Sequence, residues 1–148
     1  METQELIAVL ENAFGMNSRI QNNAIRKAYN FSKQILNDSN DIKILKILPL
    51  LDSNHIYVKY WGAVIALSYR LLEERAIKEI IYILDINPKE FDSPLDLNLL
   101  KMDAGAILYD YKKNGVVGSF PGHNDNYKIS LLPNFDRVVR YYKRKYKL

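Results

Sequence analysis

Apolar residues recur at helical spacing along most of this 148-residue chain. They fall three and four positions apart, as on one face of an α-helix, and nowhere alternate cleanly as in a half-buried strand. We therefore expect an all-α protein with six principal helices, at about residues 4–14, 18–36, 42–51, 55–72, 73–84 and 94–113.

The boundaries between these helices carry residues that end or begin a helix. Gly15 follows the first helix, and Asn114-Gly115 follows the sixth. Residues 37–41, NDSND, separate the second helix from the third, and Asp52-Ser53-Asn54 precedes the fourth. Ser93 stands as a cap before Pro94 at the first helical position, which predicts where the sixth helix begins.

The six helices form three consecutive pairs joined by short connections. Pairs that stack side by side make a short α-solenoid, in which each pair packs only on its neighbours. We expect residues 1–115 to form this helical domain. Residues 116–148 are expected on the same domain as an extended segment punctuated by glycine and proline, with a short amphipathic helix over 135–146.

The fourth helix is apolar around most of its circumference, which is typical of a helix buried on most sides. It belongs to the stretch LPLLDSNHIYVKYWGAVIAL (48–67), which holds the single tryptophan. We expect Trp61 to lie in the core. Pro49 should kink the last turn of the preceding helix or restart it, and the small residues of the fourth helix should let a neighbouring helix approach closely. Its one narrow polar or small strip consists of Lys59, Gly62, Ala66 and Arg70.

Two helices carry charged stripes with a spacing of seven residues. The second has Arg19, Arg26 and Lys33, and the sixth has Asp96, Asp103 and Asp110. In a three-pair stack the second, fourth and sixth helices lie side by side, so a concave face would run from the basic stripe, past Lys59 and Arg70, to the acidic one. Such a face suits a partner of complementary charge. Solvated faces, or rungs of an Asp–Arg/Lys ladder between repeats, stay open as the alternative.

The composition excludes several kinds of site. The absence of cysteine excludes disulfides, thiolate metal sites and a cysteine nucleophile. His55 and His123 are two distant histidines, whereas a zinc site needs three or four ligands. The sequence has no G-x-S-x-G, P-loop or dinucleotide-binding motif. We therefore expect no cofactor, no metal and no enzymatic activity, with an acid–base site at Asp103 or Asp110 as the enzymatic alternative.

The net charge of +4 is unevenly distributed. Residues 137–148, RVVRYYKRKYKL, contain six basic residues and no acidic one, so the preceding residues carry a net charge of −2. Basic residues interleaved with tyrosines can bind the phosphates of a nucleic acid while the tyrosine rings stack on its bases. Alternatively, the tyrosines pack on the last helix pair while the charged groups stay in water. The acidic N-terminal segment is unlike a signal peptide and no apolar run is long enough to span a bilayer, so we expect a cytoplasmic protein.

The order of features from Leu48 to Leu67 resembles a HEAT repeat, with an LPLL run, a turn containing Asp52, and a helix rich in small residues. Over residues 18–115 the chain is similar to a family of short bacterial HEAT-like proteins catalogued as a domain of unknown function. Residues 58–63, VKYWGA, match its V-R-x-W-A-A motif, with Lys and Gly at two positions where the family has Arg and Ala. Residues 23–26 match an N-R-A-I-like helix opening, and Asp103-Ala104 with YKKNG (111–115) match a D-A segment followed by W-K-K-G.

This resemblance implies a HEAT-like fold and a habit of protein binding, because some similar small proteins are immunity proteins that neutralise bacterial toxins. We therefore expect a protein that binds and blocks a toxin encoded nearby through its concave charged face. The alternative is a HEAT-like protein that binds nucleic acid with Arg19, Arg26, Lys33 and the basic tail. No membrane partner is expected.

Overall fold

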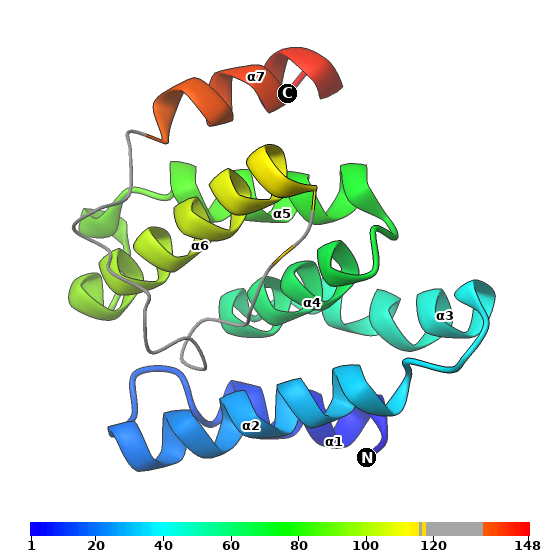
Figure 1. Ribbon diagram of the computed structural model, residues 1–148. Helices are drawn as coiled ribbons and strands as arrows, with labels where there is room; N and C mark the ends of the chain where they lie inside the picture. The colour runs from blue at the N-terminus through cyan, green and yellow to red at the C-terminus, as the bar shows by residue number, and fades with distance from the viewer. Residues whose placement is uncertain (116, 118–134) are drawn as a thin grey trace.

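Residues 1–115, 117 and 135–148, which this computed structural model describes, form seven α-helices and one short 3-10 helix (Figure 1). The elements are α1 Thr3–Glu11, α2 Ser18–Gln34, α3 Asn40–Leu51, α4 Ile56–Ser68, α5 Glu73–Asp85, η1 Pro88–Glu90, α6 Pro94–Asn114 and α7 Asp136–Tyr146. None of the described residues lies in a strand, which confirms the all-α prediction. Most of the predicted extended segment, including His123, lies outside the described residues.

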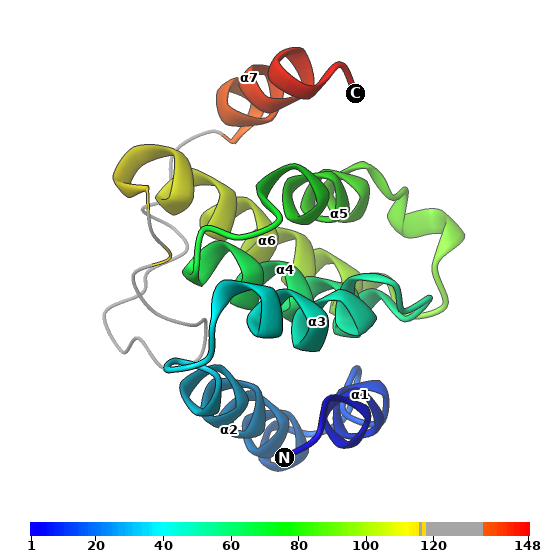
Figure 2. The ribbon, with the colours of Figure 1, turned by 90° about the vertical axis from the view of Figure 1, so that its right-hand side faces the viewer.

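The first six helices stack as three pairs, α1–α2, α3–α4 and α5–α6. Figure 2 shows α1, α3 and α5 along one side of the stack and α2, α4 and α6 along the other. Helix α4 lies at the centre and packs most extensively against α3 and α5. Helix α7 lies at the end opposite α1 and α2, where it contacts α5 and α6 (Figure 1). We call the surface formed by α2, α4 and α6 the α2–α4–α6 face.

Helix α4 forms the centre of the core, as its apolar sequence predicts. Every residue from Ile56 to Leu67 is buried except Lys59. Trp61 is 1% exposed, which confirms its assignment to the core. A Cβ atom at position 62 would lie only 2.7 Å from Cβ of Leu50 on α3. The missing side chain of Gly62 therefore lets α3 approach α4 closely, as predicted.

Helix α4 ends at Ser68, four residues before the predicted end at Leu72. The N–H of Leu71 donates to the carbonyl of Ala66, and the N–H of Arg70 donates to that of Leu67. These two bonds, with Arg70 at a φ of 54°, make a Schellman turn. The apolar period continues to Leu72 because Leu72 packs against the core after the helix has stopped, so periodicity alone misplaced the boundary.

Most other helix boundaries agree with the sequence, but α1 ends at Glu11, three residues before the predicted end, and the residue that caps α4 is His55 rather than one of residues 52–54. Asn17 and Ser39 accept hydrogen bonds from the first turns of α2 and α3. Ser93 precedes α6 as predicted, but its side chain makes no capping hydrogen bond. Pro49 lies inside α3, which continues through it to Leu51. Gly115 ends α6 with a φ of 68°, as expected of a glycine C-cap.

Helix α7 attaches the basic tail to the end of the stack. Val138 and Tyr142 are buried, which confirms the amphipathic helix predicted there. Glu73 of α5 accepts hydrogen bonds from the hydroxyls of Tyr146 at 2.5 Å and Tyr111 at 3.0 Å. Burial acts to raise the pKa of Glu73, but hydrogen bonds from Tyr146, Tyr111 and Lys145 outweigh it and lower the pKa. Acidic residues of α5 thus neutralise part of the positive charge of the tail.

No helix among the described residues is both long and apolar enough to cross a membrane.

Candidate functional site

The basic row on α2 consists of Arg19, Arg26 and Lys33, and all three are exposed. The opposite side of α2, including Ala28 and Phe31, is buried against the rest of the stack. None of the three basic side chains forms an ion pair with a described residue. Lys33 instead places its Nζ 4.8 Å from the centre of the Tyr29 ring. This row is therefore a solvated charged surface.

The acidic row on α6, Asp96, Asp103 and Asp110, is partly buried. It also makes no ion pair within the described part of the chain. Burial raises the pKa of Asp103 to about 6. Burial also raises the pKa of Asp110, while the charge of Lys113 acts to lower it. Because burial penalises a carboxylate that lacks a cation, Asp103 is the residue of this row that most needs a positive partner.

A small cavity of about 140 Å³ opens between α2, α4 and α6. Four aromatic rings and two carboxylates are among the groups that line it: Phe14, Tyr57, Tyr60, Trp61, Asp96 and Asp103. The structure therefore brings two members of the acidic row together at this cavity. The basic row is not part of its lining, although Gln21 and Ile25 of α2 are.

The aromatic rings of this cavity are in mutual contact. The ring centre of Tyr57 lies 5.3 Å from that of Phe14 and 6.3 Å from that of Trp61, and Tyr60 lies 5.3 Å from Trp61. Burial raises the pKa of Tyr57, a hydrogen bond with Trp61 opposes that rise, and the negative charge of Asp103 adds to it. The negative charge of Asp103 therefore acts directly on the hydroxyl of Tyr57.

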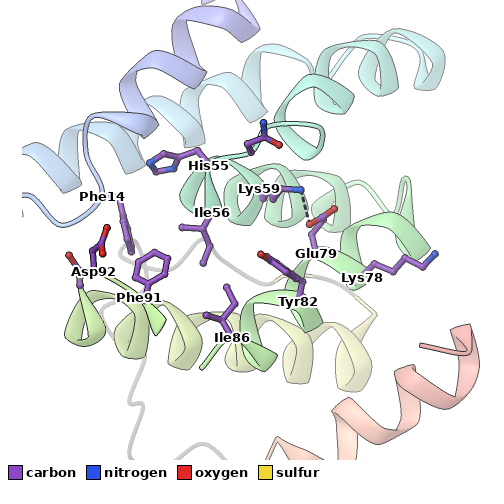
Figure 3. A pocket seen from close by; sticks show the side chains of 12 residues that line it. Phe14, His55, Ile56, Lys59, Lys78, Glu79, Tyr82, Ile86, Phe91 and Asp92 are labelled. Carbon is purple, nitrogen blue, oxygen red and sulfur yellow. Dashed lines mark hydrogen bonds and ion pairs between the residues drawn. The ribbon is translucent and has the colours of Figure 1, made fainter. Parts of the chain in front are cut away.

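Lys59 lies on another side of α4, away from this cavity. Its Nζ is 3.1 Å from Oε2 of Glu79 on α5, and Figure 3 shows this pair on the wall of a larger cavity of about 720 Å³. Arg75 bonds Oε1 of Glu79 at 3.3 Å and Oδ1 of Asp52 at 2.8 Å. Lys59 therefore belongs to a ladder of charges between neighbouring helix pairs, which is the alternative that the sequence left open for it.

Arg70 lies within the connection between α4 and α5 and contacts Gly115, the residue that ends α6. Its Nε donates to the carbonyl oxygen of Gly115 at 2.6 Å. A guanidinium at the C-terminus of a helix donates to a carbonyl that has no partner within the helix, and its positive charge interacts favourably with the negative end of the helix dipole. The structure thus gives Arg70 a local structural contact and does not bring it together with Lys59 or with the basic row.

Sequence reasoning missed two parts of this arrangement. Arg75 and Glu79 were not singled out, although their spacing of four residues on the fifth helix is a signal for an ion pair. Tyr57 was assigned to the core side of α4, and its burial supports that. The period of one helix does not show that this side borders a cavity, because the cavity depends on how α2, α4 and α6 are spaced.

The described residues include no group of three or more His, Asp or Glu side chains placed to hold a metal ion. Comparison of the chain with known proteins gave no further assignment: no protein-family model, no curated protein and no solved structure matches it.

Proposed function

We propose that this chain is a short HEAT-like solenoid that binds a protein partner with its α2–α4–α6 face. The stacking of α1 to α6 as three pairs supports the HEAT-like assignment, because solenoids present a binding surface made from one helix of each pair (Figure 2). The acidic row on α6 supplies two residues to the lining of the cavity in this surface, and the basic row lies on the exposed side of α2, opposite its buried side. A partner with complementary charges would be oriented by the two rows together.

The observation that carries this proposal is the absence of ion-pair partners for both rows within the described residues. The ladder on the other side of α4 demonstrates that this chain does pair its charges where they serve packing. Lys59, Arg75 and Glu79 are all engaged there. The rows on α2 and α6 contribute no such pairing among the described residues, which supports assigning their charges to contact with another molecule.

We further propose that the partner is a bacterial toxin and that this chain is its immunity protein. The support is the motif resemblance at residues 23–26, 58–63 and 103–115. Binding would block the toxin by covering its active cleft or its substrate surface. An immunity protein needs binding residues and no catalytic centre, which agrees with a site built from charged rows.

Co-expression with the product of the neighbouring open reading frame tests this proposal. Wild type should restore growth against a toxic neighbour and be captured with it in a pull-down. The reversals Arg26→Glu and Asp110→Lys should each weaken capture and protection by about tenfold or more. Lys89→Glu on η1 is the matched control, since Lys89 is exposed and outside both rows. A non-toxic neighbour, or equal effects of all three reversals, would contradict the proposal.

Nucleic-acid binding is a second candidate, and one observation favours it. Arg137, Arg140 and Arg144 are exposed on α7 and make no ion pair with a described residue. However, α7 and α2 lie at opposite ends of the stack, with α6, the helix that carries the acidic row, between them (Figure 1). One nucleic acid that contacted both basic regions would have to cross these carboxylates, so we rank this candidate second.

Binding of DNA and RNA oligonucleotides at several salt concentrations separates the two candidates. A nucleic-acid-binding protein would lose affinity steeply as salt rises, by about one power of salt for each phosphate contact. We expect no such binding at low salt. A steep salt dependence that disappears in an Arg137→Gln/Arg140→Gln/Arg144→Gln variant would reverse the ranking.

A further inference from the structure

We propose that the small cavity between α2, α4 and α6 receives one cationic side chain, a lysine or an arginine, of the protein partner. This inference rests on the proposed function, because it names the chemistry by which the α2–α4–α6 face would hold that partner. Two kinds of group in the lining of the cavity, aromatic rings and carboxylates, favour a cation.

The aromatic cluster supplies the first of these features. The ring of Trp61 lies at 90° to that of Tyr57 and at 75° to that of Tyr60. Rings at such angles present their faces in more than one direction. The face of an aromatic ring attracts ammonium and guanidinium groups, and several rings around one space form the cages that bind alkylated cations.

The carboxylates supply the second feature. Asp103 makes no ion pair within the described residues, and burial raises its pKa to about 6. A cation placed beside this carboxylate would act in the opposite direction. An ammonium or guanidinium placed beside Asp103 would form a charge-assisted hydrogen bond and remove the cost of its buried charge. Asp96 adds a second negative charge to the same lining.

The size of the cavity restricts what it can hold. Its volume of about 140 Å³ corresponds to roughly four or five water molecules at their liquid volume. Pockets for drug-sized molecules are typically about 300–1,000 Å³, so this one fits a single side chain. An apolar side chain would leave Asp103 without a partner, and an acidic one would be repelled. In the larger cavity, the carboxylate of Glu79 already has a cationic partner, because it is paired with Lys59.

The single tryptophan of the chain permits a direct test, because Trp61 lines the cavity. We suggest titrating wild type with n-butylguanidinium and with its neutral isostere n-butylurea. The indole N–H resonance of Trp61 and its fluorescence report occupancy. Asp103→Asn removes one of the two carboxylates in the cavity, and Asp92→Asn removes an exposed carboxylate that lines the larger cavity.

We expect n-butylguanidinium to shift the Trp61 resonance saturably and n-butylurea to bind at least tenfold more weakly. Asp103→Asn should weaken binding of the cation by about tenfold or more, as loss of a charge-assisted hydrogen bond implies, and Asp92→Asn should leave it unchanged. Binding should also weaken as the pH falls below 6. Equal binding of the neutral probe, an unchanged affinity in Asp103→Asn, or loss of binding in Asp92→Asn would each overturn the inference.

The same variants separate this inference from the function on which it rests. If the neighbouring gene product binds wild type and Asp103→Asn equally but fails to bind Arg26→Glu, the face binds a partner without a cation in the cavity, and the inference fails alone. If n-butylguanidinium binds as expected but no neighbouring product binds, the cavity is a cation site and the proposed partner is wrong.

Discussion

On the side of α4 that packs against α5, Lys59, Glu79 and Arg75 form a connected set of ion pairs, whereas the rows on α2 and α6 have none within the described residues. Both regions are rich in charge, and both flank the same central helix. Their difference indicates two uses of charge. Partly buried pairs join neighbouring helices, and removing one member leaves the other without a partner. Charges that lack an intramolecular partner contribute little to stability and can be assigned to binding.

The largest effect is expected where α3 meets α4. Gly62→Ala places a Cβ atom 2.7 Å from Cβ of Leu50 and 3.1 Å from the backbone nitrogen of Leu51, so a helix must move. We expect a loss of about 3 kcal/mol in the free energy of unfolding, measured in urea. Gly105→Ala is the matched comparison: the three atoms nearest to the new Cβ, at 2.3–2.8 Å, all belong to the side-chain ring of Phe135, whereas two of the three at position 62 are backbone atoms of α3. An equal or larger loss at position 105 would contradict this ranking.

Glu79→Gln tests the paired side of the comparison. Glu79 is 13% exposed and bonds both Lys59 and Arg75, so its neutral isostere leaves two cations with a weaker partner. We expect the free energy of unfolding to fall by about 2 kcal/mol. Arg26→Gln on the unpaired side should change it by less than about 0.5 kcal/mol. Similar losses in both variants would remove the distinction between the two regions.

Asp103→Asn should raise the free energy of unfolding, whereas the two substitutions above lower it. Because the pKa of Asp103 rises from 3.8 to about 6 on folding, the folded state binds the proton more tightly than the unfolded state. Its ionisation therefore lowers stability as the pH rises from about 4 to 6, and the cost stays constant above that. We expect Asp103→Asn to be more stable than wild type by about 1–2 kcal/mol at pH 7. Unfolding in urea at pH 4, 5, 6 and 7 should show this gap opening with pH.

Glu73→Gln should change stability less than the substitutions at Gly62, Glu79 and Asp103. The carboxylate of Glu73 accepts hydrogen bonds from Tyr111 and Tyr146, and its lowered pKa means that ionisation stabilises the fold. This contribution is present at neutral pH and is lost as the pH falls below the usual value of 4.5. We expect a loss of about 1 kcal/mol, because the group is partly exposed. Amide hydrogen exchange in the variant and in wild type would locate the change, because the rate should increase more in α7 than in α4.

The sequence predicted the helical elements well because hydrophobic period and cap residues are local signals. Ser18, Pro94 and Gly115 mark boundaries that the structure confirms. The end of α4 was misplaced because Arg70 takes a left-handed conformation that residue type does not announce. A non-glycine residue at this position is uncommon, since its Cβ makes the conformation less favourable.

The candidate site was harder to anticipate from the sequence. A spacing of seven residues groups Asp96, Asp103 and Asp110 on one side of α6, but their burial depends on how closely α2 and α4 approach. The function of the polar strip of α4 was also not predictable from the sequence of that helix alone. Lys59 and Gly62 share one side of the helix, and that side packs against α5 and α3, so the strip serves packing in this structure.

The most direct measurement is calorimetric titration of the neighbouring gene's product with wild type and with an Arg19→Gln/Arg26→Gln/Lys33→Gln variant, alongside urea unfolding of both proteins. We expect the triple variant to bind at least tenfold more weakly while its free energy of unfolding stays within about 1 kcal/mol of wild type. Unchanged affinity would contradict the assignment of the unpaired charges to partner binding, and so would a loss of stability as large as that of Glu79→Gln.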